Sequence, residues 1–232
     1  MRLFLIFTFF FFFYQITFSQ TTAEVNFGGS FNKNLQSIVN SNYNIENALS
    51  LNTSIQINKP LLKEWLINFG LGFVPKDYIY KGKGNYSVIE QRVSNSYIQF
   101  NLCGYRKIAI GKRIVFFIGA GGFTGYLIAR KQSGVLPNIY NVLNLNTPSN
   151  SVSLSNFSEN QVIDEKIDNR FEIGIRISLG VSLKVNARGR LKLSANYDYS
   201  ITEQEKQYML NQSTKLNRTL MTTIGYEFQL FK

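Results

Sequence analysis

Five charged side chains stand at alternating positions within otherwise apolar runs, an arrangement that could hold ion pairs inside a closed interior. They are Glu172, Arg176, Lys192, Asp198 and Glu227. Arg176 and Asp198 are equidistant from a short segment centred near Ala187, so an antiparallel hairpin would place them opposite each other on one face. Where bulk water is excluded, breaking such a pair costs about 3–5 kcal/mol. We expect a structural pair that plugs the interior, rather than a proton or ligand pathway, and the other three charges could extend it into a network.

The residue types that common catalytic and metal sites require are scarce. The 232 residues include no histidine and one cysteine. Serine–histidine–aspartate and cysteine–histidine nucleophile systems, and histidine-ligated metals, therefore cannot be built. An internal disulfide framework and a cysteine-based zinc site are excluded as well. The sequence predicts a protein that is not an enzyme, with no catalytic residue, no metal site and no cofactor.

Glycines are concentrated in the run Gly119-Ala-Gly-Gly-Phe-Thr-Gly125. A phosphate-binding glycine loop needs a strand before it and a helix after it, whereas this run lies inside an extended apolar stretch. Close packing between neighbouring strands is therefore the favoured interpretation. Cys103 alternates with Asn101 and Tyr105, which indicates a packed, inert thiol.

The elements that must position these residues are β-strands, because apolar side chains recur with a period of two. The run from Phe171 to Leu183 is the clearest, with apolar residues at every odd position and small or charged residues between them. It is about twice the usual length of a strand in a soluble protein. Similar patterns predict eight strands in all, near residues 25–31, 49–57, 65–73, 97–105, 113–130, 171–183, 191–199 and 223–230. The pattern leaves open which face of 113–130 points inward.

The connections between these strands alternate in length. Tight turns are expected at Asn58-Lys59-Pro60, near 107–112 and at 186–189, and long polar connections at 32–46, 77–94, 131–168 and 201–217. Short turns on one side and long loops on the other are typical of an outer-membrane barrel with periplasmic turns and extracellular loops. The sequence thus predicts an all-β, eight-stranded, antiparallel up-and-down transmembrane barrel, with both chain ends in the periplasm.

Two soluble folds compete with the membrane barrel. A secreted lipocalin-like barrel would bind an apolar ligand with its apolar face inward, and a β-sandwich would have shorter strands. The composition of the polar face favours the membrane barrel. Its side chains are small and rich in amides rather than in Lys and Glu, which suits a narrow lumen better than a solvent-facing surface. Aromatic residues gather at strand ends on the apolar face, as in interfacial girdles. Trp65 lies at the turn side, and Phe31, Phe171, Tyr197 and Tyr199 lie at the loop side.

Residues 1–19 have the features of a secretory signal peptide, so the barrel domain is expected to span 20–232. Arg2 supplies the positive start, and an apolar run from Leu3 to Tyr14 follows, interrupted only by Thr8. Small residues at Thr17 and Ser19 then suit signal peptidase, which predicts cleavage after Ser19. Export of this kind fits the outer membrane of a Gram-negative bacterium.

Two stretches resemble the PorT-like outer-membrane barrels of the Bacteroidetes. One is the middle hairpin, Ser96-Tyr-Ile-Gln-Phe-Asn-Leu-Cys-Gly-Tyr-Arg followed by Phe116-Phe-Ile-Gly-Ala-Gly-Gly-Phe-Thr-Gly-Tyr-Leu. The other is the pair of closing segments that start at Gly189 and Arg218. Small conjugation barrels of the same phylum look similar. The resemblance implies the fold and the location, and it names no site residue.

The formal charge of +11 is concentrated at the three short turns. The cations there are Lys59, Lys63, Arg106, Lys107, Lys112, Arg113, Lys184, Arg188 and Arg190. No nucleic-acid site is expected, since such a site would combine these cations with stacking aromatics in one groove. Outer-membrane lipid is the expected partner, together with an envelope protein bound through segment 131–168 or the basic turns. We expect a structural element, receptor or assembly and secretion partner rather than a pore, because side chains fill an eight-stranded barrel.

Overall fold

The computed structural model describes residues 21–36, 42–84, 87–137, 154–206 and 214–230, and the expected signal peptide lies outside them. The strands are β1 (Thr22–Gln36), β2 (Tyr43–Pro60), β3 (Trp65–Gly82), β4 (Glu90–Ile110), β5 (Ile114–Pro137), β6 (Leu154–Gln161), β7 (Phe171–Lys184), β8 (Gly189–Ser200) and β9 (Lys215–Gln229). Within these ranges, no helix has the length and apolar character needed to cross a membrane.

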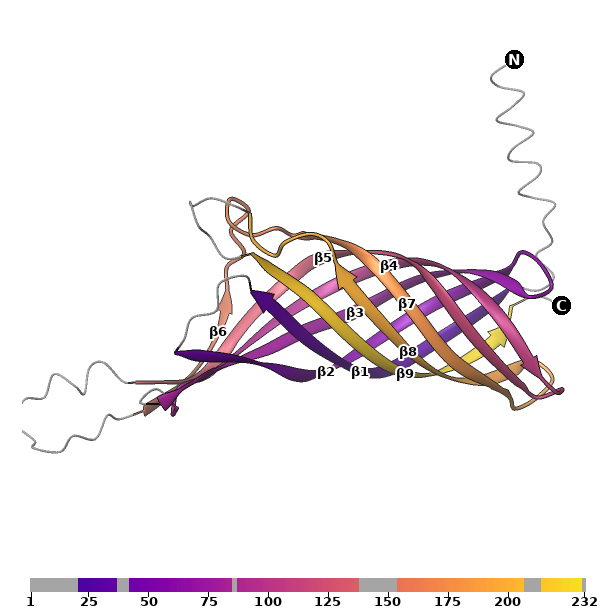
Figure 1. The fold of residues 1–232 in the computed structure, drawn as a ribbon, viewed down its shortest axis with the longest axis horizontal. Coiled ribbons are helices and arrows are strands. Elements are labelled where there is room, and N and C mark those ends of the chain that lie inside the picture. The colour runs from indigo at the N-terminus through magenta and orange to yellow at the C-terminus, as the bar shows by residue number, and fades with distance from the viewer. Residues whose placement is uncertain (1–20, 37–41, 85–86, 138–153, 207–213, 231–232) are drawn as a thin grey trace, which may run out of the picture.

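Eight of the strands close into one antiparallel ring (Figure 1). Each ring strand pairs with its neighbour along the chain, except that β5 skips β6 to pair with β7. β1 closes the ring by pairing with β9 along its whole length, from Thr22 opposite Gln229 to Gln36 opposite Lys215. The predicted eight-stranded, up-and-down antiparallel barrel is thereby confirmed.

Alternation sorts the side chains of each strand onto two faces. In β7, Phe171, Ile173 and Ile175 point outward and are each at least half exposed, whereas Glu172 and Arg176 are buried inside. Other strands repeat the pattern, with amides such as Asn26, Asn52, Asn68 and Asn101 inside. An apolar exterior around a polar interior is the inverse of a lipocalin, so the soluble alternative is wrong. The expected girdle aromatics, Trp65, Phe31, Phe171, Tyr197 and Tyr199, are all exposed on the outer face.

The two ends of the barrel differ as the connection lengths predict. At one end, hereafter the turn end, short turns occupy 61–64, 111–113 and 185–188. The expected turn at Asn58-Lys59-Pro60 was placed too early, because all three residues still belong to β2 and pair with β3. Gly111 has a φ of 67°, a left-handed conformation that glycine adopts without strain.

At the opposite loop end, several strands continue well past the predicted boundaries. β3 extends to Gly82, β4 starts at Glu90 and β5 extends to Pro137, so the expected connections 77–94 and 131–168 were drawn too long. Within the second of them, β6 is an additional strand, and among the described strands it pairs with β5 alone (Figure 1). The physical reason is that backbone pairing continues beyond the apolar belt, where the sequence loses the alternation that revealed the strands.

Candidate functional site: the filled lumen and the turn-end cavity

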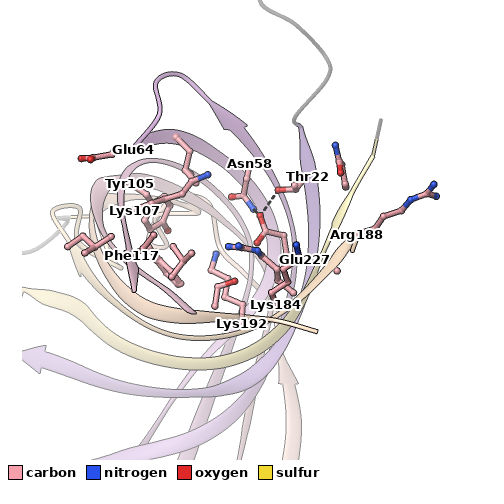
Figure 2. Close-up of a pocket in the computed structure, with 18 of the residues that line it drawn as sticks. Thr22, Asn58, Glu64, Tyr105, Lys107, Phe117, Lys184, Arg188, Lys192 and Glu227 are labelled. Carbon is pink, nitrogen blue, oxygen red and sulfur yellow. Dashed lines mark hydrogen bonds between the residues drawn. The ribbon is translucent and has the colours of Figure 1, made fainter. Parts of the chain in front are cut away.

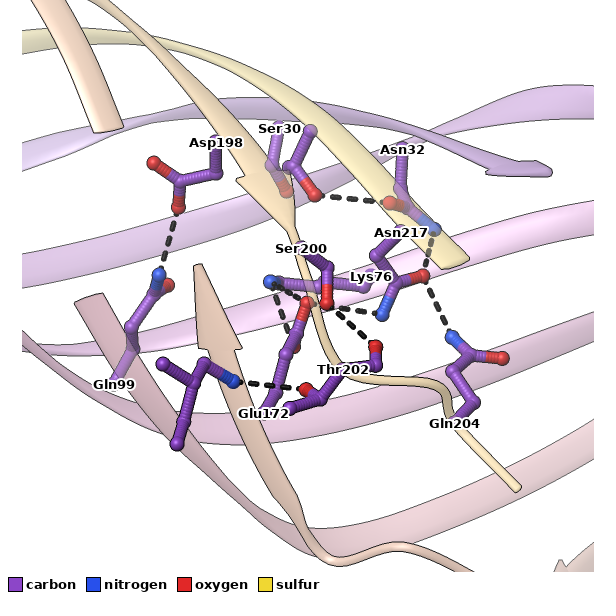
Figure 3. Close-up of polar contacts among 12 residues, drawn as sticks. Ser30, Asn32, Lys76, Gln99, Glu172, Asp198, Ser200, Thr202, Gln204 and Asn217 are labelled. Atoms are coloured by element: carbon purple, nitrogen blue, oxygen red, sulfur yellow. Dashed lines mark hydrogen bonds and ion pairs between the residues drawn. The ribbon is translucent and has the colours of Figure 1, made fainter. Parts of the chain in front are cut away.

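The middle of the lumen holds the pair formed by Arg176 and Asp198. The register of β7 and β8 sets the two residues directly opposite each other. Arg176 Nε and Nη2 donate to the two carboxylate oxygens of Asp198 at 2.6 and 2.8 Å. Gln99 Nε2, from β4 across the barrel, donates to the same carboxylate at 2.7 Å (Figure 3). Because Arg176 is 5% and Asp198 1% exposed, the bidentate pair is shielded from solvent.

Nearer the loop end, Glu172 pairs with a residue that sequence reasoning missed. Lys76 Nζ of β3 lies 2.8 Å from both carboxylate oxygens of Glu172 (Figure 3). Asn217 Nδ2 donates to Glu172 at 3.3 Å, and the Oδ1 atom of Asn217 accepts from Asn32 and Gln204. Among the described residues this layer shares no hydrogen bond with Arg176 or Asp198, so it forms a separate group rather than the extended network that the sequence allowed.

Nearer the turn end, Lys192 pairs with Glu24, another residue that sequence reasoning missed. Lys192 Nζ lies 2.7 Å from Glu24 Oε2. Asn58 Nδ2 donates to Glu24 at 3.2 Å and to Glu227 at 3.4 Å. Glu227 also accepts from the Thr22 hydroxyl at 2.6 Å. The five expected residues therefore lie on the lumen side, but they belong to three layers spaced along the barrel axis.

One wall of the lumen is aromatic rather than polar. In β5, Phe117, Phe123 and Leu127 are buried, while Phe116 and Ile118 are exposed, which settles the facing that the sequence left open. The glycines make room for these rings. A Cβ on Gly119 would overlap the Tyr105 ring, and a Cβ on Gly180 would overlap the Phe117 ring. The packing interpretation of the glycine run is confirmed.

The lysines of the two layers nearer the barrel ends pack against this aromatic wall. Lys76 Nζ lies 4.8 Å from the centroid of the Phe123 ring, and Lys192 Nζ lies 4.3 Å from that of Phe117. Each ammonium thus combines a carboxylate partner with a favourable cation–π contact. The mid-barrel cavity beside Arg176 and Gln99 measures about 20 Å³, room for about one water molecule. The lumen is filled by side chains at this level.

A larger cavity opens at the turn end (Figure 2). This turn-end cavity has a volume of about 740 Å³. Its apolar floor consists of Leu66, Tyr105 and Phe117. Its charged lining consists of the cations Lys63, Arg106, Lys107, Lys184, Arg188, Arg190 and Lys192 and the carboxylates Glu64 and Glu227. In Figure 2 Lys107 and Lys192 extend toward the cavity, whereas Arg188 and Glu64 point away from it.

The described residues gather neither metal ligands nor an exposed thiol at these sites. Across the described ranges, no group of three or more Cys, Asp and Glu side chains could hold a metal ion. Cys103 is buried at 1% exposure within the cluster of Leu66, Tyr105 and Phe117. Burial removes its thiol from reagents, in agreement with an inert packed cysteine.

Lys76 and Glu24 were missed because both lie outside the predicted strands. The third strand was expected to end at residue 73, and the first to begin at residue 25. Pro75 makes the extension of β3 hard to recognise, since proline is disfavoured within sheets. The alternation Val74, Lys76, Tyr78 continues the inward face of β3, and that signal could have identified Lys76.

Three solved structures are similar to this chain at low sequence identity. The outer membrane protease OmpT of Escherichia coli is 9% identical, with a TM-score of 0.53, over 92% of this chain and 98% of that chain. OprG of Pseudomonas aeruginosa is 9% identical, with a TM-score of 0.49, over 91% and 97%. Neisserial surface protein A is 13% identical, with a TM-score of 0.43, over 90% and 97%. At 9% identity the likeness to OmpT concerns the fold alone.

The family comparison is more informative than the individual structures. None of the curated proteins matches the chain. The family model described as an outer membrane protein beta-barrel domain matches residues 13–229. This match covers every strand of the ring, and the apolar exterior agrees with residence in the outer membrane. The chain belongs to the outer membrane protein beta-barrel domain family.

Proposed function

We propose that this chain is a non-enzymatic, closed outer-membrane barrel that acts as a structural element, receptor or assembly and secretion partner through its loop end. The observation that carries the proposal is the combination of a filled lumen with a braced extension beyond the ring. The three buried ion pairs and the aromatic wall leave the barrel as a rigid support rather than a conduit. Binding surfaces are commonly carried on loops that such a scaffold positions.

The loop end is held by ion pairs and hydrogen bonds that fix its connections. Arg130 Nη1 of β5 lies 2.6 Å from Asp168 Oδ1, and Arg130 Nε donates to Asn95 Oδ1 at 2.9 Å. Asp168 Oδ2 accepts from the Asp164 backbone N–H at 2.9 Å, and Asp168 forms an isolated bridge with Glu205. Segment 162–170 is therefore tied both to the barrel wall and to the connection after β8. Such preorganisation reduces the entropy lost when a partner binds.

The proposal also covers the orientation of the barrel, the removal of its signal peptide and its kind of partner. The loop end faces the outside of the cell and the turn end faces the periplasm, because short turns of such barrels are periplasmic. Residues 1–19 are removed as a signal peptide. The resemblance of the middle hairpin and closing segments supports a PorT-like barrel of the Bacteroidetes, with an envelope protein as the partner. The mass of the mature protein tests the cleavage site.

Site-specific photo-crosslinking tests the partner proposal. A photoreactive amino acid at Asn156 or Ser158 stands on the exposed face of β6, and the matched control at Ile177 faces lipid. In the native membrane we expect a discrete adduct with an envelope protein from the two β6 positions and none from Ile177. Adducts from a position at the turn end, such as Ala187, with none from β6, would contradict binding through the loop end.

A further inference from the structure

The turn-end cavity carries more positive charge than its own carboxylates neutralise. Arg106 pairs with Glu64 at 3.3 Å, and Lys192 pairs with Glu24. Among the residues that the structure describes, the other five cations of the cavity have no carboxylate within ion-pairing distance. They are Lys63, Lys107, Lys184 and Arg190, together with Arg188, whose side chain points away from the cavity (Figure 2). Clustered like charges of this kind create a positive potential that attracts anions.

Two of these unpaired cations are partly withdrawn from water. Lys107 and Arg190 are neither fully exposed nor buried, and they line the cavity from β4 and β8. Glu227 stands opposite Arg190 in the β8–β9 register, but its carboxylate accepts hydrogen bonds from Thr22 and Asn58 instead. Glu227 acts on Lys107 only from beyond ion-pairing distance, and partly desolvated cations that form no ion pair are costly. An anion from outside the chain would offset that cost.

The shape and floor of the cavity limit the ligand to a small anion. About 740 Å³ lies within the usual range for small-molecule sites and is too confined for a polymer to thread. The apolar floor of Leu66, Tyr105 and Phe117 lowers the local dielectric, which strengthens charge–charge attraction. A carboxylate offers two oxygens in one plane, whereas the several oxygens of a phosphate group can accept from lysine and arginine in different directions.

We propose that the turn-end cavity binds a phosphate-bearing anion. Two sources could supply this group, a soluble phosphate ester or the headgroup of an anionic phospholipid. The second source is compatible with the turns themselves, because Leu61, Leu62 and Ile110 are 52%, 69% and 57% exposed beside the cavity. Apolar side chains at turn tips contact the interfacial region of a bilayer favourably.

The first experiment tests the soluble source. Calorimetry measures the affinity of the whole barrel for inorganic pyrophosphate in nonionic detergent. The double variant Lys107→Gln/Arg190→Gln removes the two half-buried cations. We expect binding to weaken about 25-fold, since each of the two cations near an anionic group contributes about fivefold. The matched control Lys81→Gln/Lys83→Gln removes the same charge from exposed positions of the loop end and should bind as the parent does.

The lipid arm uses the single tryptophan, Trp65, which begins β3 at the turn end. Vesicles that contain brominated phosphatidylglycerol or brominated phosphatidylcholine quench its fluorescence according to which lipid occupies the neighbouring surface. We expect stronger quenching by phosphatidylglycerol, and we expect the Lys107→Gln/Arg190→Gln variant to lose that preference while the loop-end control keeps it.

The outcomes separate the two sources from failure of the proposal. Pyrophosphate binding alone assigns a soluble ligand, and a phosphatidylglycerol preference alone assigns the headgroup. If the barrel shows neither pyrophosphate binding nor a phosphatidylglycerol preference, the proposed anion site is wrong. It is also wrong if the loop-end control variant loses binding or preference as much as Lys107→Gln/Arg190→Gln does. A heat-dependent gel shift verifies folding of each variant. If Lys107→Gln/Arg190→Gln does not fold, Lys63→Gln/Lys184→Gln replaces it, because both of its positions are exposed.

Discussion

Breaking the Arg176–Asp198 pair one residue at a time should destabilise the barrel far more than removing both residues together. Arg176→Ala leaves the Asp198 carboxylate with Gln99 alone, and Asp198→Ala leaves a buried guanidinium with no carboxylate. Both groups are at least nine-tenths buried, so each single change should cost about 3–5 kcal/mol of unfolding free energy. In the double variant no charge remains stranded, and the coupling between the two positions should be about 2–3 kcal/mol.

The assay is reversible urea unfolding in phospholipid vesicles, followed by the fluorescence of Trp65 and extrapolated linearly to water. The matched control is the pair formed by Arg106 and Glu64, whose side chains are 54% and 56% exposed at a separation of 3.3 Å. Solvent screening should keep the coupling of that pair below about 1 kcal/mol. If the losses at Arg176 and Asp198 add, or if their coupling equals that of the control pair, the reasoning about a shielded central pair is wrong.

Three further outcomes follow from the packing and pairing of the strands. Gly119→Ala should lower the midpoint of urea unfolding, because a Cβ at Gly119 overlaps the Tyr105 ring. Gly104→Ala is the control and should leave the midpoint unchanged, because nothing lies within 4 Å of a Cβ there. Equal midpoints for the two variants would contradict the packing. Cys103 should react with a maleimide only after unfolding, as mass spectrometry would detect, since its exposure is 1%; rapid labelling of the folded barrel would disprove its burial. Deleting 226–232 should abolish insertion, because the start of β1 loses its partner strand and leaves unpaired backbone in lipid, each group costing several kcal/mol. Recovery of that truncated chain as a heat-modifiable membrane species would refute this expectation.

The sequence predicts the strands reliably only where one face contacts lipid, because lipid contact is what imposes the apolar alternation. Within the apolar belt, alternation located all eight ring strands, and turn symmetry correctly placed Arg176 opposite Asp198. Both inferences use neighbours along or between adjacent strands, where the spacing of residues determines the geometry. The strand ends at the loop side and the extra strand β6 lack the lipid-facing signal, so they could not be identified in this way.

Sequence patterns could not predict which side chains contact each other across the lumen. Lys76 reaches Glu172 from β3 to β7, and Lys192 reaches Glu24 from β8 to β1. Neither pair lies on adjacent strands, so their meeting depends on the curvature and stagger of the closed ring. The sequence could show that these charges face inward, but not which charge each one meets.

Single-channel conductance in planar bilayers shows directly whether side chains fill the lumen. The purified wild-type barrel is inserted into a lipid film and the current is recorded under an applied voltage. Because three ion-pair layers and an aromatic wall occupy the interior, we expect no stable conductance steps above the bare film. Discrete, reproducible open-channel steps from the wild-type protein would contradict it and would identify the barrel as a pore.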